Sequence, residues 1–370
     1  MANIILYDPS DLRDHLKPLT LTRPVAAIRF GIMTMAEKWH KATDATVYYH
    51  TADYLQSKYP DTPSPADTDL LIAANICPSA ELIQHLSTAT TGTAILTPDG
   101  TEIARIGHIQ PVTTVTLSAA PLSFNSIPDI FNLNGDALLL DYRAITAGRH
   151  SQPLPANCTL IGQPFDADGH PNLFIEEGAT LNCSSINVTD GPVYIGRQAE
   201  VMEGCHLRGP IALCEHSTFN MGTKVYGKTT IGPWCKIGGE INNVVIFGYS
   251  NKAHDGFLGN AVIGEWCNLG AGCVASNLKN NYAKIRLWDY ATRSFAKTGL
   301  QFCGLIMGDH SKAGIQTMFN TATVVGVGCN VYGAGFPRTF IASFPQGGKD
   351  GFTPHPLDKM LDTARMVMAR

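Results

Sequence analysis

The clearest pattern in the chain is an apolar residue at every sixth position. Between residues 195 and 237 this period is unbroken, and four residues after most of these positions the side chain is small. A period of six fits neither an α-helix nor a simple strand. It is typical of a hexapeptide β-helix, in which three hexapeptides form a triangular coil with the apolar residue inside and the small one near a corner. The run consists of Ile195, Val201, Leu207, Leu213, Phe219, Val225, Ile231 and Ile237.

Further runs of the same period lie on both sides of the first, separated from it by slips. The pattern is interrupted by a polar stretch, 247–256, and by a long insertion, 276–303. Long loops on such a scaffold usually carry function. The predicted inward positions are Ile175 and Leu181, then Val245, Asn251, Phe257, Ile263, Leu269 and Ala275, then Met307, Ala313, Phe319, Val325 and Val331, with Leu154 and Leu160 in a first coil.

The chain has ten cysteines but no Cys-x-x-Cys motif, which argues against a zinc ribbon or a thioredoxin-like site. The repeat accounts for most of them, because six fall on predicted small corner positions. We therefore expect buried, reduced, structural thiols. The six are Cys158, Cys205, Cys235, Cys267, Cys273 and Cys329.

Before residue 146 the pattern changes to strands that alternate with helices, which predicts an α/β domain with a mainly parallel sheet. At the other end, a helical apolar face over 357–368 predicts a helix that caps the last coil, as open solenoid ends need. The expected N-terminal elements are strands at 4–6, 45–49, 70–74 and within 93–120, and helices at 31–42 and after Ser79 as N-cap.

The predicted organisation therefore has three parts. Residues 1–145 form the α/β domain, residues 146–340 a left-handed parallel β-helix, and residues 341–370 a capping tail. The period does not determine the hand, which is taken from hexapeptide proteins in general.

Composition narrows the classes of partner. Charged residues make up 16% of the chain and the net charge is −4, which argues against nucleic-acid binding. No apolar stretch approaches the ~18 residues of a membrane-spanning helix. The first residues lack the basic region of a signal peptide, so we expect a cytoplasmic protein with no membrane partner.

In the first domain, the most chemically suggestive segment follows the first strand, where α/β sheets often bind ligands. Arg23 and Arg29 suit phosphate recognition, and Lys38 follows in the next predicted helix. A solvated loop with structural ion pairs is the alternative.

In the β-helix, His254 lies near a predicted corner and can accept a proton near neutral pH. Glu240, less than one coil earlier, would orient the imidazole and favour its charged form. A structural role is the alternative. His216 and His310 have the same predicted position in their hexapeptides, as in a hexapeptide carbonic anhydrase, but stacking places His216 and His254 about 10 Å apart, too far for one zinc ion within a subunit.

These residues resemble a known family. Three segments and Asn277 look like the acetyltransferase domain of bacterial bifunctional GlmU, and the whole chain is more similar still to short GlmU-like sugar nucleotidyltransferases of the Bacteroidetes. The GlmU-like segments are 239–241, 248–259 and 263–272; those shared with the short forms are 18–24, 37–39, 280–282 and 298–303.

The resemblance implies acetylation of glucosamine-1-phosphate by acetyl-CoA, with His254 as the base and Glu240 as the carboxylate that polarises it. It implies a sugar-phosphate contact for Asn268 and an acetyl-CoA contact for Asn277. The chain departs from the family at an acceptor-binding tyrosine, a phosphate-binding lysine and a cofactor-site serine. The residues there are Phe257, Asn242 and Ile315, while Lys252 or Lys279 would replace the missing charge and Arg338 would meet a CoA phosphate.

The resemblance also implies a homotrimer with sites between subunits, and nucleotidyl transfer from a nucleoside triphosphate, with Mg²⁺, to the sugar-1-phosphate. The first loop, 17–23, lacks the glycines of the family, and Asp136 or Asp141 would hold the metal. The predicted activities are thus those of a glucosamine-1-phosphate N-acetyltransferase and a UDP-N-acetylglucosamine diphosphorylase. The alternatives are a nucleotidyltransferase with a purely structural β-helix, a hexapeptide carbonic anhydrase, and a non-catalytic trimeric scaffold.

Overall fold

The computed structural model describes residues 3–62 and 64–369, which form two compact units. The first contains the described residues up to Leu16, with Thr22–Arg29 and Met33–Ser126. The second contains Lys17–Leu21, Phe30–Ile32 and the described residues from Ile127 onward. The division precedes the expected boundary at residue 145, because two helices, α4 (Ile127–Asn132) and α5 (Asn134–Thr146), pack on the β-helix.

The first unit is an α/β domain, as predicted, built on a six-stranded sheet in the order β2-β1-β3-β5-β4-β6. β1 pairs in parallel with β2 and β3, and β4 with β6. β5 runs antiparallel to both neighbours because a tight turn joins it directly to β4, so the sheet is mainly but not wholly parallel. The strands are β1 (Ile4–Tyr7), β2 (Val47–His50), β3 (Leu70–Ala73), β4 (Thr93–Leu96), β5 (Glu102–Ile106) and β6 (Thr113–Thr116).

Both predicted helices of this unit are present, although the one expected over 31–42 begins only at Met35. α2 begins with a capping box, in which the Glu37 N–H donates to Thr34 Oγ1 over 3.2 Å and the Thr34 N–H to Glu37 Oε2 over 2.7 Å. Ser79 caps α3 by accepting from the Leu82 N–H. No helix within the described residues combines the length and apolarity that a bilayer crossing needs. The helices of this unit are α1 (Ser10–His15), α2 (Met35–Thr43) and α3 (Ala80–Thr88), with 3₁₀ turns at Val25–Ala27 and Asp53–Leu55.

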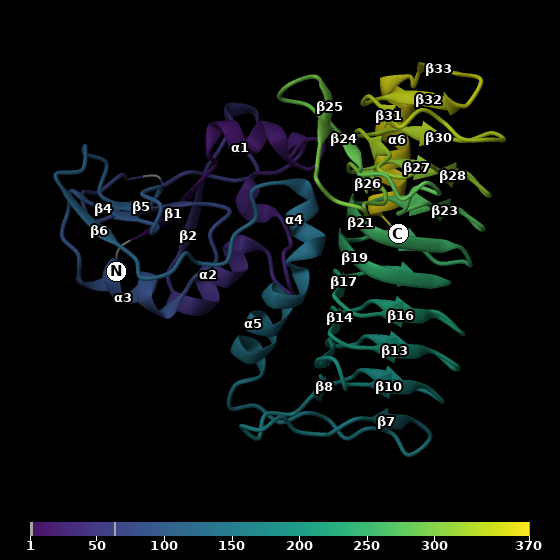
Figure 1. Cartoon of the computed structure of the whole chain (residues 1–370), viewed down its shortest axis with the longest axis horizontal. Helices are drawn as coiled ribbons and strands as arrows, with labels where there is room; N and C mark the ends of the chain where they lie inside the picture. Colours follow the sequence, from purple (N-terminus) through teal and green to yellow (C-terminus); the bar gives the residue numbers. More distant parts are fainter. Residues whose placement is uncertain (1–2, 63, 370) are drawn as a thin grey trace. The chain divides into compact units, whose positions relative to one another are not determined.

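The second unit is a parallel β-helix with three faces, which confirms the predicted fold class (Figure 1). β19 (Glu240–Gly248) and β21 (Phe257–Glu265) each bend from face A to face B. Face A contains β7 (Thr159–Ile161), β10 (Ser185–Asn187), β13 (His206–Arg208), β16 (Lys224–Tyr226), the starts of β19 and β21, β23 (Val274–Ala275) and β28 (Met318–Phe319). Face B contains β8 (Leu173–Ile175), β11 (Val193–Ile195), β14 (Ile211–Leu213), β17 (Thr229–Ile231), the ends of β19 and β21, β26 (Ile306–Met307), β29 (Val324–Val325) and β31 (Phe340–Ile341). Face C contains β9 (Thr180–Leu181), β12 (Glu200–Val201), β15 (Thr218–Phe219), β18 (Lys236–Ile237), β20 (Asn251–Lys252), β22 (Asn268–Leu269), β27 (Lys312–Ala313), β30 (Asn330–Val331), β32 (Pro345–Gly348) and, antiparallel at the end, β33 (Gly351–Pro354).

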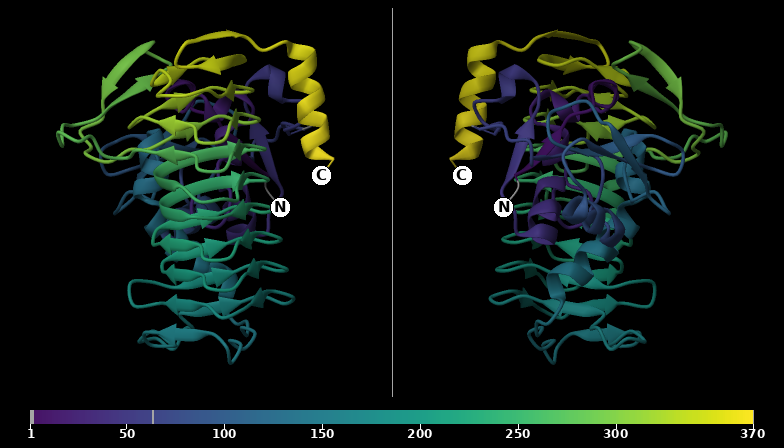
Figure 2. Two further views of the ribbon diagram at one scale, coloured as in Figure 1. Left: turned by 90° about the vertical axis from the view of Figure 1, so that its right-hand side faces the viewer. Right: turned by 90° about the vertical axis from the view of Figure 1, so that its left-hand side faces the viewer.

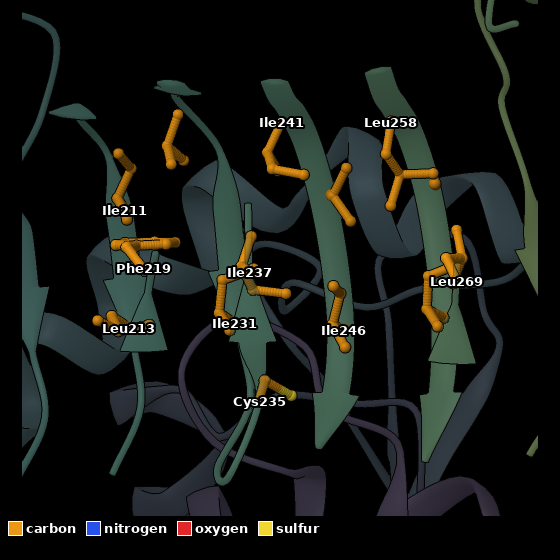
Figure 3. Packing of buried hydrophobic residues seen from close by; sticks show 14 of the residues in the cluster. Ile211, Leu213, Phe219, Ile231, Cys235, Ile237, Ile241, Ile246, Leu258 and Leu269 are labelled. Atoms are coloured by element: carbon orange, nitrogen blue, oxygen red, sulfur yellow. The ribbon is translucent and has the colours of Figure 1, made fainter. Parts of the chain in front are cut away.

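The eight inward positions predicted between Ile195 and Ile237 are all buried in one continuous core, part of which is shown in Figure 3. The runs beginning at Ile175 and Met307 are also confirmed. Leu154 and Leu160 pack against the core while partly exposed.

The expected second run is wrong at its first three positions. Ile246, Lys252 and Leu258 point inward in place of Val245, Asn251 and Phe257. The chain advances only four residues from Ile237 to Ile241 and five from there to Ile246, so a strict period of six loses register at this point.

The small residues at the corner between faces B and C hold consecutive coils together. Ser250 Oγ donates to the Gly264 carbonyl over 2.9 Å and accepts from the Cys267 N–H over 2.9 Å. Ser217 Oγ likewise donates to the Gly232 carbonyl and accepts from the Cys235 N–H. Ser311 Oγ donates to the Gly326 carbonyl and accepts from the Cys329 N–H. Five of the six predicted corner cysteines are buried and Cys158 is half-buried, all as free thiols. The column of small residues at the corner between faces B and C consists of Ala199, Ser217, Cys235, Ser250, Cys267, Ser311 and Cys329.

The tail differs from the predicted cap. The β32–β33 hairpin ends the stack on face C, and α6 (Leu357–Met368) lies beside the coils (Figure 2). His355, just before the helix, lies with Nδ1 3.3 Å from the Gly328 carbonyl oxygen. Of the predicted apolar face, only Met360 and Ala364 are buried. The insertion contains another hairpin, β24 (Arg286–Asp289) with β25 (Ser294–Lys297), and Trp288 of this hairpin stacks on Phe340 at 4.0 Å.

One inward position holds a charge. Lys252 is 2% exposed and stands in the face C column between Ile237 and Leu269. Its ammonium donates to the carbonyls of Gly238, over 3.0 Å, and His254. Burial lowers the pKa of Lys252 to about 8, although Cys273 and Asp255 act in the opposite direction.

The corner serines are expected to contribute to stability. Ser250→Ala leaves a buried N–H and a buried carbonyl without their partner, so the free energy of unfolding should fall by about 1–3 kcal/mol. Ser250→Cys is the matched control, because a thiol already fills this role one coil earlier, where Cys235 Sγ accepts from the Ser250 N–H. Denaturant unfolding followed by circular dichroism measures both; equal losses would contradict the hydrogen-bonding role.

Lys252→Met replaces a buried charge by an apolar side chain of similar length, but it also leaves the Gly238 and His254 carbonyls without their donor, so its two effects on stability oppose each other. Below pH 8 both the folded and unfolded wild-type chains hold the proton, and the full cost of burying the charge remains. Between pH 8 and 10.5 only the unfolded chain holds it, so wild-type stability rises with pH. The stability of the variant relative to the wild type should therefore fall by about 2–3 kcal/mol between pH 7 and pH 10.5. Unfolding midpoints across this range measure it, and a constant difference would contradict the assignment.

Candidate functional site

In the first unit, the carboxyl end of β1 carries a buried carboxylate that the sequence reasoning missed. Asp8 Oδ1 accepts from the Val25 N–H over 2.8 Å, and its Oδ2 accepts from Thr51 Oγ1 over 2.5 Å and Arg13 Nε over 3.2 Å. Burial raises the pKa of Asp8 despite these bonds. The signal was available, since Asp8 follows the first apolar strand directly. The carboxylate fastens the loop that contains Arg23 to the strand end.

The three predicted phosphate-binding cations lie in this loop and in the segment that follows it, and all are buried side chains. Arg23 is 2% exposed, Arg29 8% and Lys38, on α2, 3%. Arg29 Nη1 lies 3.7 Å from Glu37 Oε2, within the first turn of α2. The loop is therefore an ordered part of the domain and not a solvated one.

The two alternative magnesium ligands lie in different environments. Asp141 is buried and its Oδ2 accepts from the Ile32 N–H over 2.7 Å, while Asp136 is exposed on the same helix, α5. Within residues 3–62 and 64–369, the group of three or more side chains spaced for a metal ion is Asp166, Asp168 and His170, in the loop between β7 and β8. Asp166 Oδ1 accepts from the backbone N–H groups of the other two, which accounts for the loop's shape.

In the second unit, His254 and Glu240 lie at one corner, between faces C and A. His254 is exposed between β20 and β21, and Glu240 begins β19 one coil earlier. The Gly238 N–H donates to the Lys252 carbonyl over 2.7 Å and the Glu240 N–H to the Gly256 carbonyl over 3.2 Å, so the two segments are in backbone contact. We call Gly238–Glu240 and Ala253–Gly256 the His254 corner. No hydrogen bond joins the two side chains in the described structure.

Three predicted contact residues gather beside this corner on face A. Phe257 pairs with Glu240, and Asn242 with Gly259. A Cβ on Gly259 would stand 2.5 Å from Phe257 Cζ and 2.7 Å from Asn277 Nδ2, so the ring and the amide meet over this glycine. Asn277 also donates to Asn260 Oδ1 over 2.8 Å. Phe257, Asn242 and Asn277 thus form a polar and aromatic surface beside the corner that carries the exposed His254 imidazole.

The remaining candidates are more dispersed. Ile315 is 74% exposed at the same corner two coils further on, linked through backbone bonds from Gln316 to Ala271 and from Gly272 to Asp255. Asn268 projects from face C. Lys279 is half-buried at the start of the insertion, and Arg338 is exposed just before β31. Lys252 points into the core, so its charge is not presented on the surface as expected for a substrate contact.

The other two histidines lie at a different corner, between faces B and C. His216 stacks on Trp234 with centroids 4.1 Å apart, and His310 on Trp266 at 6.2 Å. Tyr249 also stacks on Trp266, at 4.3 Å. The three histidines therefore do not converge within one chain, because His254 lies at another corner of the triangle.

Residues 4–150 match the model of a family described as sugar nucleotidyl transferase. The bifunctional protein GlmU of Methanocaldococcus jannaschii is 29% identical over 123 residues, which span 33% of this chain and 27% of that protein. A solved structure of AntD, an N-acyltransferase from Bacillus cereus in complex with dTDP and 3-hydroxybutyryl-CoA, aligns with 54% of this chain and 89% of its own, at 11% identity and a TM-score of 0.21.

The aligned region thus covers about a quarter of the GlmU relative. The first unit lies within the matched range, together with α4 and α5. Residues 4–150 are therefore similar to sugar nucleotidyl transferases, in agreement with the GlmU-like resemblance of the sequence.

Proposed function

We propose that the first unit transfers a nucleotidyl group from a nucleoside triphosphate to a sugar-1-phosphate. The family match over residues 4–150 carries this proposal. In the reaction a phosphate oxygen of the sugar-1-phosphate attacks the α-phosphorus and pyrophosphate leaves. The contribution of the protein to such a step is mainly positioning and charge stabilisation. Arg23 and Arg29 supply planar guanidinium groups suited to phosphate oxygens, in a loop that Asp8 holds at the end of β1.

This activity is tested with a panel of sugar-1-phosphates, UTP and dTTP, with Mg²⁺ or with EDTA, by measuring pyrophosphate release. We expect release with Mg²⁺ and the matching nucleotide sugar as product. Arg23→Lys keeps the charge but loses the bidentate geometry, so kcat/KM should fall about 10²-fold, a loss of about 2.7 kcal/mol in transition-state stabilisation.

Arg105→Lys is the matched control, because Arg105 forms an ion pair with Glu102 on β5 and should change kcat/KM little. No nucleotide sugar from any pair of substrates would refute the proposed transfer.

We propose in addition that the His254 corner acetylates the amino group of an amino-sugar-1-phosphate, with acetyl-CoA as donor. The observation that favours it is an exposed imidazole at a corner that also carries Glu240 and borders Phe257, Asn242 and Asn277. The amine attacks the thioester carbonyl, the imidazole accepts the proton of the amine, and the CoA thiolate leaves. A homotrimer would place a neighbouring subunit's coils opposite this corner and complete the site.

Thiol release from acetyl-CoA with glucosamine-1-phosphate tests this second activity. His254→Ala should lower kcat by about 10²–10⁴-fold, because it removes the general base. Glu240→Gln should lower it less, and His216→Ala, at another corner, should leave it near the wild-type value.

Release that is unaffected by His254→Ala would refute the role of the imidazole. No release with any amino-sugar phosphate would leave the β-helix as a scaffold for the first unit. Sedimentation velocity measures whether the chain is a trimer.

A further inference from the structure

The corner between faces C and A has its own column of small side chains, which cap backbone carbonyls. Ser184 donates to the Asn182 carbonyl over 2.8 Å, and Thr223 to the Asn220 carbonyl over 2.5 Å. Cys273 and Thr317 both donate to the Gly314 carbonyl, over 3.0 and 2.8 Å. In each case the acceptor is the residue directly after an inward position of face C. A hydroxyl or thiol at this corner therefore fixes the carbonyl where the chain leaves face C.

Two consecutive coils lack such a side chain, and they are the coils of Glu240 and His254. The column consists of Ser184, Cys205, Thr223, Gly239, Gly256, Cys273 and Thr317, as the backbone bonds between coils show. Gly239 has a φ of +80°, and a Cβ there would stand 2.7 Å from the Gly256 carbonyl oxygen. Gly256 has a φ of +127°, and a Cβ there would collide with the Cys273 carbonyl. Neither position accepts a side chain, so neither can supply a donor.

Lys252 supplies the missing donor of the first of these two coils from the interior, while in the second Asn220 Nδ2 donates to the Ala253 carbonyl over 2.8 Å. The Lys252 ammonium donates to the carbonyl of Gly238, which is the residue directly after inward Ile237 and thus the equivalent of Asn182, Asn220 and Gly314. It donates as well to the carbonyl of His254 itself. One buried cation therefore joins the backbone of the proposed base to the turn from which Glu240 begins. An apolar residue would occupy this inward position without any such bond.

We propose that Lys252 is a positioning residue, which holds the backbone of His254 against the Gly238–Glu240 turn. This inference rests on the proposed acetyl transfer only for its kinetic consequence. The contacts themselves predict how the backbone of the corner moves when the ammonium is removed.

The test compares Lys252→Met with Leu269→Met, which changes the next inward residue of the same column and leaves the ammonium in place. Hydrogen–deuterium exchange of the full chain reports on the backbone without any substrate. In Lys252→Met, the amides of residues 253–257 should exchange at least 10-fold faster than in the wild type, while those of 270–273 keep their rates. Leu269→Met should leave 253–257 unchanged.

If acetyl transfer is present, Lys252→Met should lower kcat about 10-fold with little change in the KM for acetyl-CoA. Unchanged exchange at 253–257, or a uniform acceleration over all coils, would overturn the positioning role. Absence of transfer in the wild type would refute the proposed acetylation alone, because the exchange experiment judges the role of Lys252 separately.

Discussion

The constraint on which the β-helix depends is that every coil stacks directly on the last, at the spacing of paired strands. Inward side chains then form columns, and each corner must satisfy the carbonyls that leave the ladder where the chain turns. Serine, threonine and cysteine do this from within the corner, as Ser217, Ser250 and Thr223 show. The same residues are small enough for the next coil to approach. The cysteine content of the chain is thus a packing requirement.

The His254 corner meets this constraint in a different way. The coil that contains Gly238 and Gly239 turns in fewer residues than its neighbours, and the backbones approach too closely for a corner side chain. The donor comes from the interior instead, at the cost of burying the charge of Lys252. Such a cost is common where a protein keeps strain or a buried charge close to a functional group. The position of that cost, beside the exposed imidazole, agrees with a functional role for this corner.

How far the sequence predicts the structure follows from the same feature. Where the period of six is kept, from Ile195 to Ile237 and from Met307 to Val331, the inward residues were predicted correctly. It fails where the coil shortens, because a period cannot show which turn has lost residues. Lysine at an inward position also has no apolar signal, so Lys252 was expected at the surface. Asp8 is the opposite case, since its place after the first strand was visible and its burial was not.

The candidate site residues fall into two groups, because strand register brings some of them together and a loop outside the coils brings in another. Glu240, Asn242 and Phe257 come together through strand register, which a correct coil count would predict. Asn277 reaches the same surface only because the chain after β23 leaves the coil and crosses Gly259, a position that has no side chain. No period contains that information. The tail shows the same limit, because the apolar spacing of α6 gives its helical form, but its position beside the coils depends on Met360 and Ala364 meeting a surface that the stack creates.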